Sequence, residues 1–162
     1  MRNDEEIKEK VKLAVISSFK AISFDINKKQ VDIDKTLKNF NFIDSEEFKF
    51  ENDFSKLRAK SDSEALKFKY SDLSILEKNK PKNNAQNNLY NISEKIRYEL
   101  IGSKKYNGVR KNLKKFYLDE KINIIAKNLS KEKEITTEQA FEIYMLKKFL
   151  DFNLEYDISK KF

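Results

Sequence analysis

The first constraint on chemistry is which reactive side chains the sequence contains. Its 162 residues include no cysteine and no histidine. Disulfides, thiolate or imidazole metal sites, cysteine nucleophiles and histidine-based triads are therefore excluded. There is also no Gly-x-x-x-x-Gly-Lys-Ser/Thr loop, the motif that cradles nucleotide phosphates. Only carboxylates, lysine, tyrosine, serine and threonine remain, and we predict no catalytic, cofactor-binding or metal-ligating residue in this chain.

One charged cluster stands out because it surrounds the only two glycines, Gly102 and Gly108. Glu94 and Arg97 are three residues apart, so they can form an ion pair on a helix, whereas Glu99 lies elsewhere around the turn. Gly102 is a natural residue to end that helix in the left-handed conformation, with a positive φ angle. Spacing alone favours an ordinary surface ion pair followed by a glycine helix end, and an exposed pair of this kind stabilises very little.

The formal net charge of +7 raises the question of a nucleic-acid partner. Only four of the 34 basic residues are arginine, and the 27 acidic residues are interspersed among the lysines. This interspersion would interrupt a continuous basic track, so a solvated surface is favoured over a nucleic-acid face. No apolar run approaches the ~20 residues that a membrane span needs, and the N-terminus, which carries charges of both signs, is unlike a targeting signal. We expect a cytoplasmic protein.

Apolar residues recur at spacings of three and four along most of the chain, which predicts helices. The predicted helices cover residues 3–23, 52–68, 84–102 and 136–152, with one long or two shorter helices between 104 and 128. Short alternating apolar runs predict a small two- or three-stranded β insert near residues 24–50. The expected architecture is mainly α: a single multi-helix domain over residues 1–162.

The last predicted helix has an unusual apolar pattern. Thr136 and Gln139 are spaced as a capping box, in which each residue bonds the backbone N–H of the other. Apolar residues between Phe141 and Phe152 then surround the helix almost completely. Such a helix is either deeply buried or offers a docking surface for another protein.

Two blocks of sequence resemble the N-terminal region of proteins of the CobT family. Members of this family are subunits of the aerobic, ATP-dependent cobaltochelatase. The stretch Arg58-Ala59-Lys60-Ser61-Asp62-Ser63-Glu64-Ala65-Leu66 resembles the family's Arg-Gly-x-Ala-Asp-x-x-Ala-Leu helix. The second block is Glu94-x-x-Arg97-x-Glu99-x-x-Gly102, followed by Gly108-Val109 and Asn112-Leu113. The resemblance implies structural or interface roles for Arg58, Asp62, Ala65, Glu94, Arg97, Glu99, Gly102, Gly108 and Asn112.

The chain departs from the family pattern at two positions. Tyr70-Ser71-Asp72 stands where the family often has a histidine before an aspartate, so no role of that histidine carries over. Lys60 stands where a small residue is usual. The sequence also ends at Phe162, before any C-terminal von Willebrand type A domain of the kind that the family carries.

The resemblance implies a function that belongs to a complex. That complex is a ligase forming nitrogen–metal bonds, which inserts cobalt into hydrogenobyrinic acid a,c-diamide in cobalamin biosynthesis. The implied partners are an AAA+ ATPase subunit and a large tetrapyrrole-binding subunit, and cobalt and Mg-ATP belong to the whole complex. This chain alone is expected to be non-catalytic and to act in assembly and coupling, with Arg97 and the carboxylates of Glu94, Asp62 and Glu99 tying helices together.

Three alternatives stay open at the level of sequence. The chain could be a CobT-like adaptor for another AAA+ metal-loading system. It could be a basic helical nucleic-acid-binding protein, for which a steep salt dependence of binding would be diagnostic. It could also be a hydrolase that uses paired Asp and Glu side chains, which would require a pocket holding two carboxylates with raised pKa values.

Overall fold

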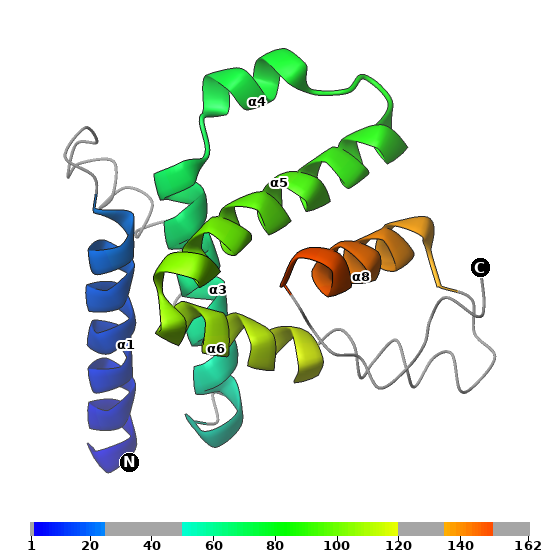
Figure 1. The fold of residues 1–162 in the computed structure, drawn as a ribbon. Coiled ribbons are helices and arrows are strands. Elements are labelled where there is room, and N and C mark those ends of the chain that lie inside the picture. Colours follow the sequence, from blue (N-terminus) through cyan, green and yellow to red (C-terminus); the bar gives the residue numbers. More distant parts are fainter. Residues whose placement is uncertain (1, 25–49, 120–134, 151–162) are drawn as a thin grey trace. The chain divides into compact units, whose positions relative to one another are not determined.

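The computed structural model describes residues 2–24, 50–119 and 135–150 (Figure 1). Within these ranges every regular element is a helix: α1 (Arg2–Ser23), α3 (Phe50–Tyr70), α4 (Leu73–Asn79), α5 (Asn84–Lys105), α6 (Asn107–Tyr117) and α8 (Thr137–Leu150). The prediction of a mainly α protein is confirmed. The predicted β insert near residues 24–50 lies, apart from its two end residues, outside the described residues.

The chain divides into two compact units, Met1–Ser71 and Asp72–Phe162. The first unit holds α1 and α3, and the second holds α4, α5, α6 and α8. That residues 1–162 form a single domain stays a prediction.

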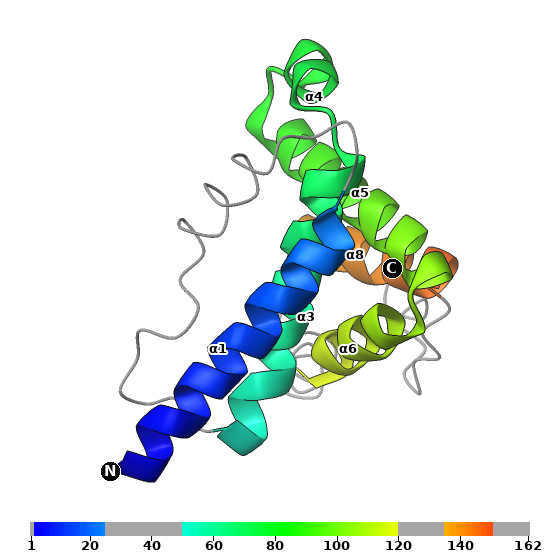
Figure 2. The same cartoon turned by 90° about the vertical axis from the view of Figure 1, so that its left-hand side faces the viewer.

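In the first unit α1 and α3 lie side by side and point in the same direction (Figures 1 and 2). The predicted apolar stripe of α1 buries its central residues. They are Val11, Val15, Phe19 and Ile22. On α3 the small residues Ser61 and Ala65 are both fully buried, and small side chains allow neighbouring helices to approach closely.

In the second unit α5 and α8 lie side by side and run in the same direction, while α6 turns back from the end of α5 (Figure 1). Asn83 caps α5, because its side-chain oxygen accepts hydrogen bonds from the backbone N–H groups of Ala85 (2.9 Å) and Gln86 (3.3 Å). The predicted start near residue 84 is therefore confirmed. No helix of the described part of the chain is both long enough and apolar enough to cross a membrane.

The short helix α4 was not predicted from the sequence. Asp72 caps it by accepting from the backbone N–H groups of Ser74 (2.9 Å) and Ile75 (3.3 Å). The helix has only seven residues, none of them buried, so it lacks the apolar stripe on which sequence-based assignment depends. The aspartate cap was its only signal.

The prediction that Gly102 ends its helix with a positive φ angle was wrong. Gly102 lies within α5, and its carbonyl accepts a hydrogen bond from the backbone N–H of Tyr106 at 2.8 Å. Tyr106 is extended (φ −126, ψ 100) and is the single residue between α5 and α6. Lys104 and Lys105 occupy the last turn of α5, where positive side chains favour the negative end of the helix dipole. This favourable charge interaction helps α5 to continue past Gly102.

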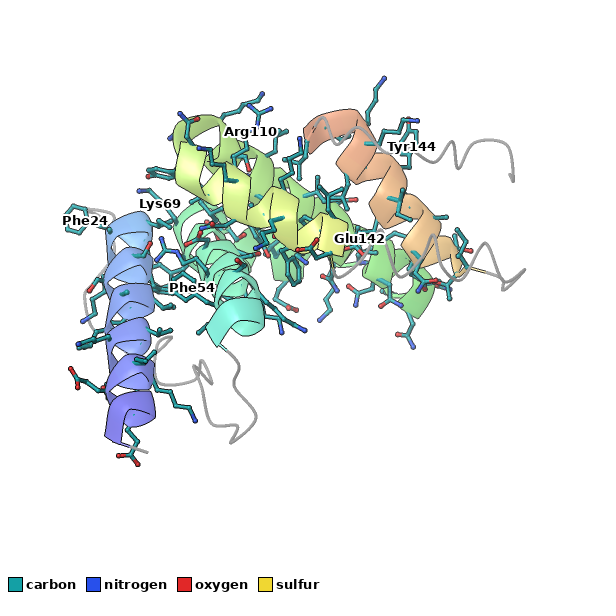
Figure 3. All side chains as sticks on the ribbon, turned by 90° about the horizontal axis from the view of Figure 1, so that it is seen from below. Phe24, Phe54, Lys69, Arg110, Glu142 and Tyr144 are labelled. Atoms are coloured by element: carbon teal, nitrogen blue, oxygen red, sulfur yellow. The ribbon has the colours of Figure 1, made fainter. Side chains whose placement is uncertain are left out.

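The capping box of α8 is present as predicted. The backbone N–H of Thr136 donates to Oε1 of Gln139 (3.0 Å), and the backbone N–H of Gln139 donates to Oγ1 of Thr136 (3.2 Å). Of the two alternatives predicted for this helix, deep burial does not apply to its whole surface, and the docking alternative stays a prediction. Three residues at spacings of three and four are buried, namely Ile143, Leu146 and Leu150. Tyr144 is 62% exposed and points out from the helix (Figure 3), so α8 has one buried face and one that keeps aromatic surface in solvent.

Candidate functional site

A fully buried carboxylate and a fully buried tyrosine meet where α6 folds back along α5. Tyr117 Oη donates a hydrogen bond of 2.6 Å to Oε2 of Glu99, and neither side chain is exposed to solvent. Burial raises the pKa of Tyr117 well above its ordinary value, and the negative charge of Glu99 and the hydrogen bond to it raise the pKa further. Tyr117 therefore stays protonated and acts as a hydrogen-bond donor, which links α5 to α6.

Charged side chains of α5 and α8 lie near this Glu99–Tyr117 pair. Lys95 of α5 places its Nζ 5.2 Å from the centre of the Tyr117 ring, within the range of a cation–π contact. Glu142 of α8, labelled in Figure 3, lies close enough that its charge also raises the pKa of Tyr117. Side chains of α5, α6 and α8 thus meet around one buried hydrogen bond.

The ion pair expected from the spacing of Glu94 and Arg97 is formed. Arg97 Nε lies 2.6 Å from Glu94 Oε2, and Arg97 Nη2 donates to Glu94 Oε1 at 2.8 Å. This bidentate contact holds the planar guanidinium in a fixed orientation. The hydrogen bond to Glu94 also raises the pKa of Arg97. The side chain of Arg97 is 46% exposed, whereas that of Glu94 is 15% exposed. The carboxylate is therefore the more buried member of the pair.

In the first unit Arg58 links α3 to α1. Its Nη2 donates to Oγ of Ser18, and its Nη1 donates to the carbonyl oxygen of Ala14 at 3.4 Å. Its Nε also lies 3.4 Å from Oδ1 of Asp62, one turn along α3, and the Asp62 side chain is fully buried. Lys69 makes a second link, because its Nζ donates to the carbonyl oxygen of Phe24 at 3.0 Å.

Several residues predicted from the family motif make side-chain contacts in the structure. Each of the three carboxylates has a partner: Arg97 for Glu94, Arg58 for Asp62 and Tyr117 for Glu99. That Arg97 and these three carboxylates together tie helices in a structural or interface role stays a prediction. Sequence reasoning missed Tyr117, although it lies four residues after Leu113 and eight after Val109, in line with the buried residues of α6.

The remaining motif residues differ in their surroundings. Ala65 is fully buried in α3, and Gly102 is buried within α5. Gly108 lies in the first turn of α6, and a Cβ atom added there would meet nothing within 4 Å. Asn112 is half-buried. Asp72, which follows the position where a histidine is usual in the family, caps α4.

Within residues 2–24, 50–119 and 135–150, no group of three or more acidic side chains is arranged to hold a metal ion. Two or more convergent oxygen ligands are the least that a divalent cation needs from a protein that offers neither imidazole nor thiolate. The described carboxylates instead make contacts within and between helices.

Comparison with known proteins gives one match. The family model described as "Cobalamin biosynthesis protein CobT" matches residues 44–150, a stretch that contains both blocks of resemblance noted in the sequence. Neither the curated proteins nor the solved structures include a match to this chain.

Proposed function

Because this chain belongs to the CobT family of cobalamin biosynthesis proteins, we propose that it is a subunit of the ATP-dependent cobaltochelatase. In this proposal the complex inserts cobalt into hydrogenobyrinic acid a,c-diamide, and this chain acts in assembly of the complex and in coupling to its AAA+ ATPase subunit. The observation that carries the proposal is the family match over residues 44–150. A third subunit, large and tetrapyrrole-binding, completes the proposed complex.

The internal contacts support a mechanical role. A chain that transmits motion from an ATPase must hold its helices together while force is applied to one of them. Arg58 fixes α3 to α1, and the Glu99–Tyr117 pair fixes α6 to α5. Glu99 is fully buried, and Arg58 also lies beside the fully buried Asp62 of its own helix. Removing the partner of a buried carboxylate is costly because it leaves charge without compensation in a site of low polarity.

In this proposal the reactive groups belong to the other subunits. Cobalt is the substrate, and divalent cobalt favours imidazole and thiolate donors, which this sequence does not contain. ATP hydrolysis requires a phosphate cradle and an ordered magnesium site, which we assign to the AAA+ subunit. The carboxylates of Asp62, Glu94 and Glu99 act on their neighbours within the chain, where they orient helices.

A binding experiment with purified subunits tests the proposal. The chain, carrying an affinity tag, is mixed with the cognate AAA+ ATPase subunit, the large subunit or both, and retained protein is measured at physiological ionic strength. We expect retention of the ATPase subunit, and retention of the large subunit when the ATPase is present. Retention of neither subunit contradicts the proposal. Retention of a different AAA+ metal-loading ATPase in their place favours the adaptor alternative.

A further inference from the structure

The positive charge of this chain is concentrated in one place. Between Glu99 and Asp119 the sequence has no acidic residue and six basic ones, while the formal net charge of the whole chain is +7. The six are Lys104, Lys105, Arg110, Lys111, Lys114 and Lys115. Acidic residues are interspersed among the basic ones elsewhere in the sequence, but they are absent from the end of α5 and from all of α6. This stretch therefore carries six of the seven positive charges by which basic residues outnumber acidic ones.

The helical geometry of α6 gathers four of these residues on one side. Val109, Leu113 and Tyr117 are buried, and they recur every four residues along one face. At about 3.6 residues per turn, the four cations of α6 fall within an arc of about 140° on the opposite side. This basic face, defined as Arg110, Lys111, Lys114 and Lys115, is exposed throughout. Figure 3 shows Arg110 pointing out from the helix.

Some exposed lysines of the other described segments pair with a carboxylate one turn away. Lys10 pairs with Glu6, and Lys80 pairs with Glu77. Within the described residues, Arg110, Lys111 and Lys114 have no such ion pair. Arg110 and Lys114 are instead four residues apart with the same sign of charge, a spacing that disfavours a helix. A helix whose exposed side carries positive charges that repel one another would be stabilised by negative charges of a binding partner.

The composition of the face indicates the kind of partner. Proteins that bind single-stranded nucleic acid combine basic residues with exposed aromatic rings on which bases stack. Here Tyr117 is fully buried and bonded to Glu99, and Tyr106 and Phe116 are half-buried, so none of these rings is fully exposed for stacking. Three of the four cations are lysines, whereas arginine is the residue enriched for paired contacts to phosphate. The face offers dense positive charge on a short rigid helix, which complements a patch of carboxylates.

We propose that the basic face of α6 is a docking surface for an acidic patch on a partner subunit of the chelatase. This inference rests on the proposed function, because the partner is a protein of that complex. Complementary charges of this kind accelerate association and select the partner, and their effect decreases with ionic strength.

The test compares two variants that remove the same charge. The face variant is Arg110→Gln/Lys111→Gln/Lys114→Gln. The control variant is Lys60→Gln/Lys78→Gln/Lys82→Gln, which changes three exposed lysines on α3, on α4 and between α4 and α5. Dissociation constants are measured for the purified ATPase subunit, for the purified large subunit and for a 30-nucleotide DNA, each at about 50 mM and about 300 mM salt. Circular dichroism confirms that both variants fold.

The inference predicts that the face variant binds one of the two subunits at least about tenfold more weakly than the wild type, while the control stays within about twofold. It also predicts that higher salt weakens wild-type binding, a measurement that needs no variant. If the wild type binds a subunit and the face variant binds it equally well, the inference is wrong and the proposed function stands. If only DNA binding falls, the face serves nucleic acid instead. If the wild type binds neither subunit, both the proposed function and the inference fail.

Discussion

At the residue scale, the contact that matters most for stability is the hydrogen bond between Tyr117 and Glu99. A carboxylate that is fully buried must keep its hydrogen bonds, because desolvation of the charged form is costly. Tyr117→Phe removes one donor to Glu99 while conserving the ring. We expect the free energy of unfolding to fall by about 2 kcal/mol, measured by urea denaturation. Tyr144→Phe is the matched control, because Tyr144 is exposed, and a similar loss in both variants would contradict the assignment.

The raised pKa of Tyr117 predicts a specific pH dependence. Because the folded state keeps this hydroxyl protonated above its ordinary pKa, the unfolded state releases that proton first as the pH rises. The stabilisation is fully present below about pH 10 and is lost above it. The free energy of unfolding of the wild type should therefore fall more steeply above about pH 10 than that of Tyr117→Phe. Equal slopes for the two proteins would show that burial does not shift this tyrosine.

At the element scale, Arg58 joins α3 to α1 through two side-chain hydrogen bonds. Arg58→Ala removes its bonds to Ser18 and Ala14 and takes a cation away from the buried Asp62. We expect a loss of about 3 kcal/mol in unfolding free energy, read from the urea midpoint. Arg110→Ala removes an exposed arginine from α6 and should change the midpoint little. If the two substitutions have the same effect, Arg58 is not an interhelical link.

The first turn of α6 contains a glycine that the fold of this chain does not require. Gly108 has open space where a Cβ would lie, and glycine within a helix is less stable than alanine by about 0.5–1 kcal/mol. Gly108→Ala should therefore raise the free energy of unfolding by about that amount, measured as an increase in the thermal midpoint. A decrease would reveal a backbone conformation or a contact that alanine cannot accommodate.

Local sequence patterns predicted those parts of the elements that depend on near neighbours. The start of α5 near Asn84, the capping box at Thr136 and the buried stripe from Val11 to Ile22 follow from residues that are close in sequence. Three features could not be predicted in this way. α4 is too short and too exposed to show periodicity, the burial of Gly102 depends on packing, and the bond from Tyr117 to Glu99 joins residues in two helices.

In the candidate site too, contacts within one helix could be predicted from the sequence, whereas contacts between helices could not. The spacing of Glu94 and Arg97 was sufficient to predict their ion pair, because both lie on one turn of α5. The contacts of Arg58 with Ser18 and Ala14 span more than 39 residues of sequence and depend on how α1 packs against α3. A charged residue can be recognised from sequence, but its partner on another helix is fixed only by tertiary packing.

At the scale of the whole molecule, the account joins two observations. The chain belongs to the CobT family over residues 44–150. Between Glu99 and Asp119 it has six basic residues and no acidic one, and four of the six form the basic face of α6. Average composition concealed that face, since 27 acidic residues seemed to balance the 34 basic ones along the chain. The proposed role in assembly and the proposed docking to an acidic partner surface account for this concentration of positive charge.

The measurement that tests this account most directly is cobalt insertion by reconstituted subunits. The AAA+ ATPase subunit, the large subunit, Mg-ATP, cobalt and hydrogenobyrinic acid a,c-diamide are combined with and without this chain, and insertion is followed by the change in the corrin absorbance spectrum. The account predicts that insertion requires the chain and that the chain alone neither hydrolyses ATP nor inserts cobalt. Insertion at the same rate without the chain, or ATP turnover by the chain alone, would contradict it.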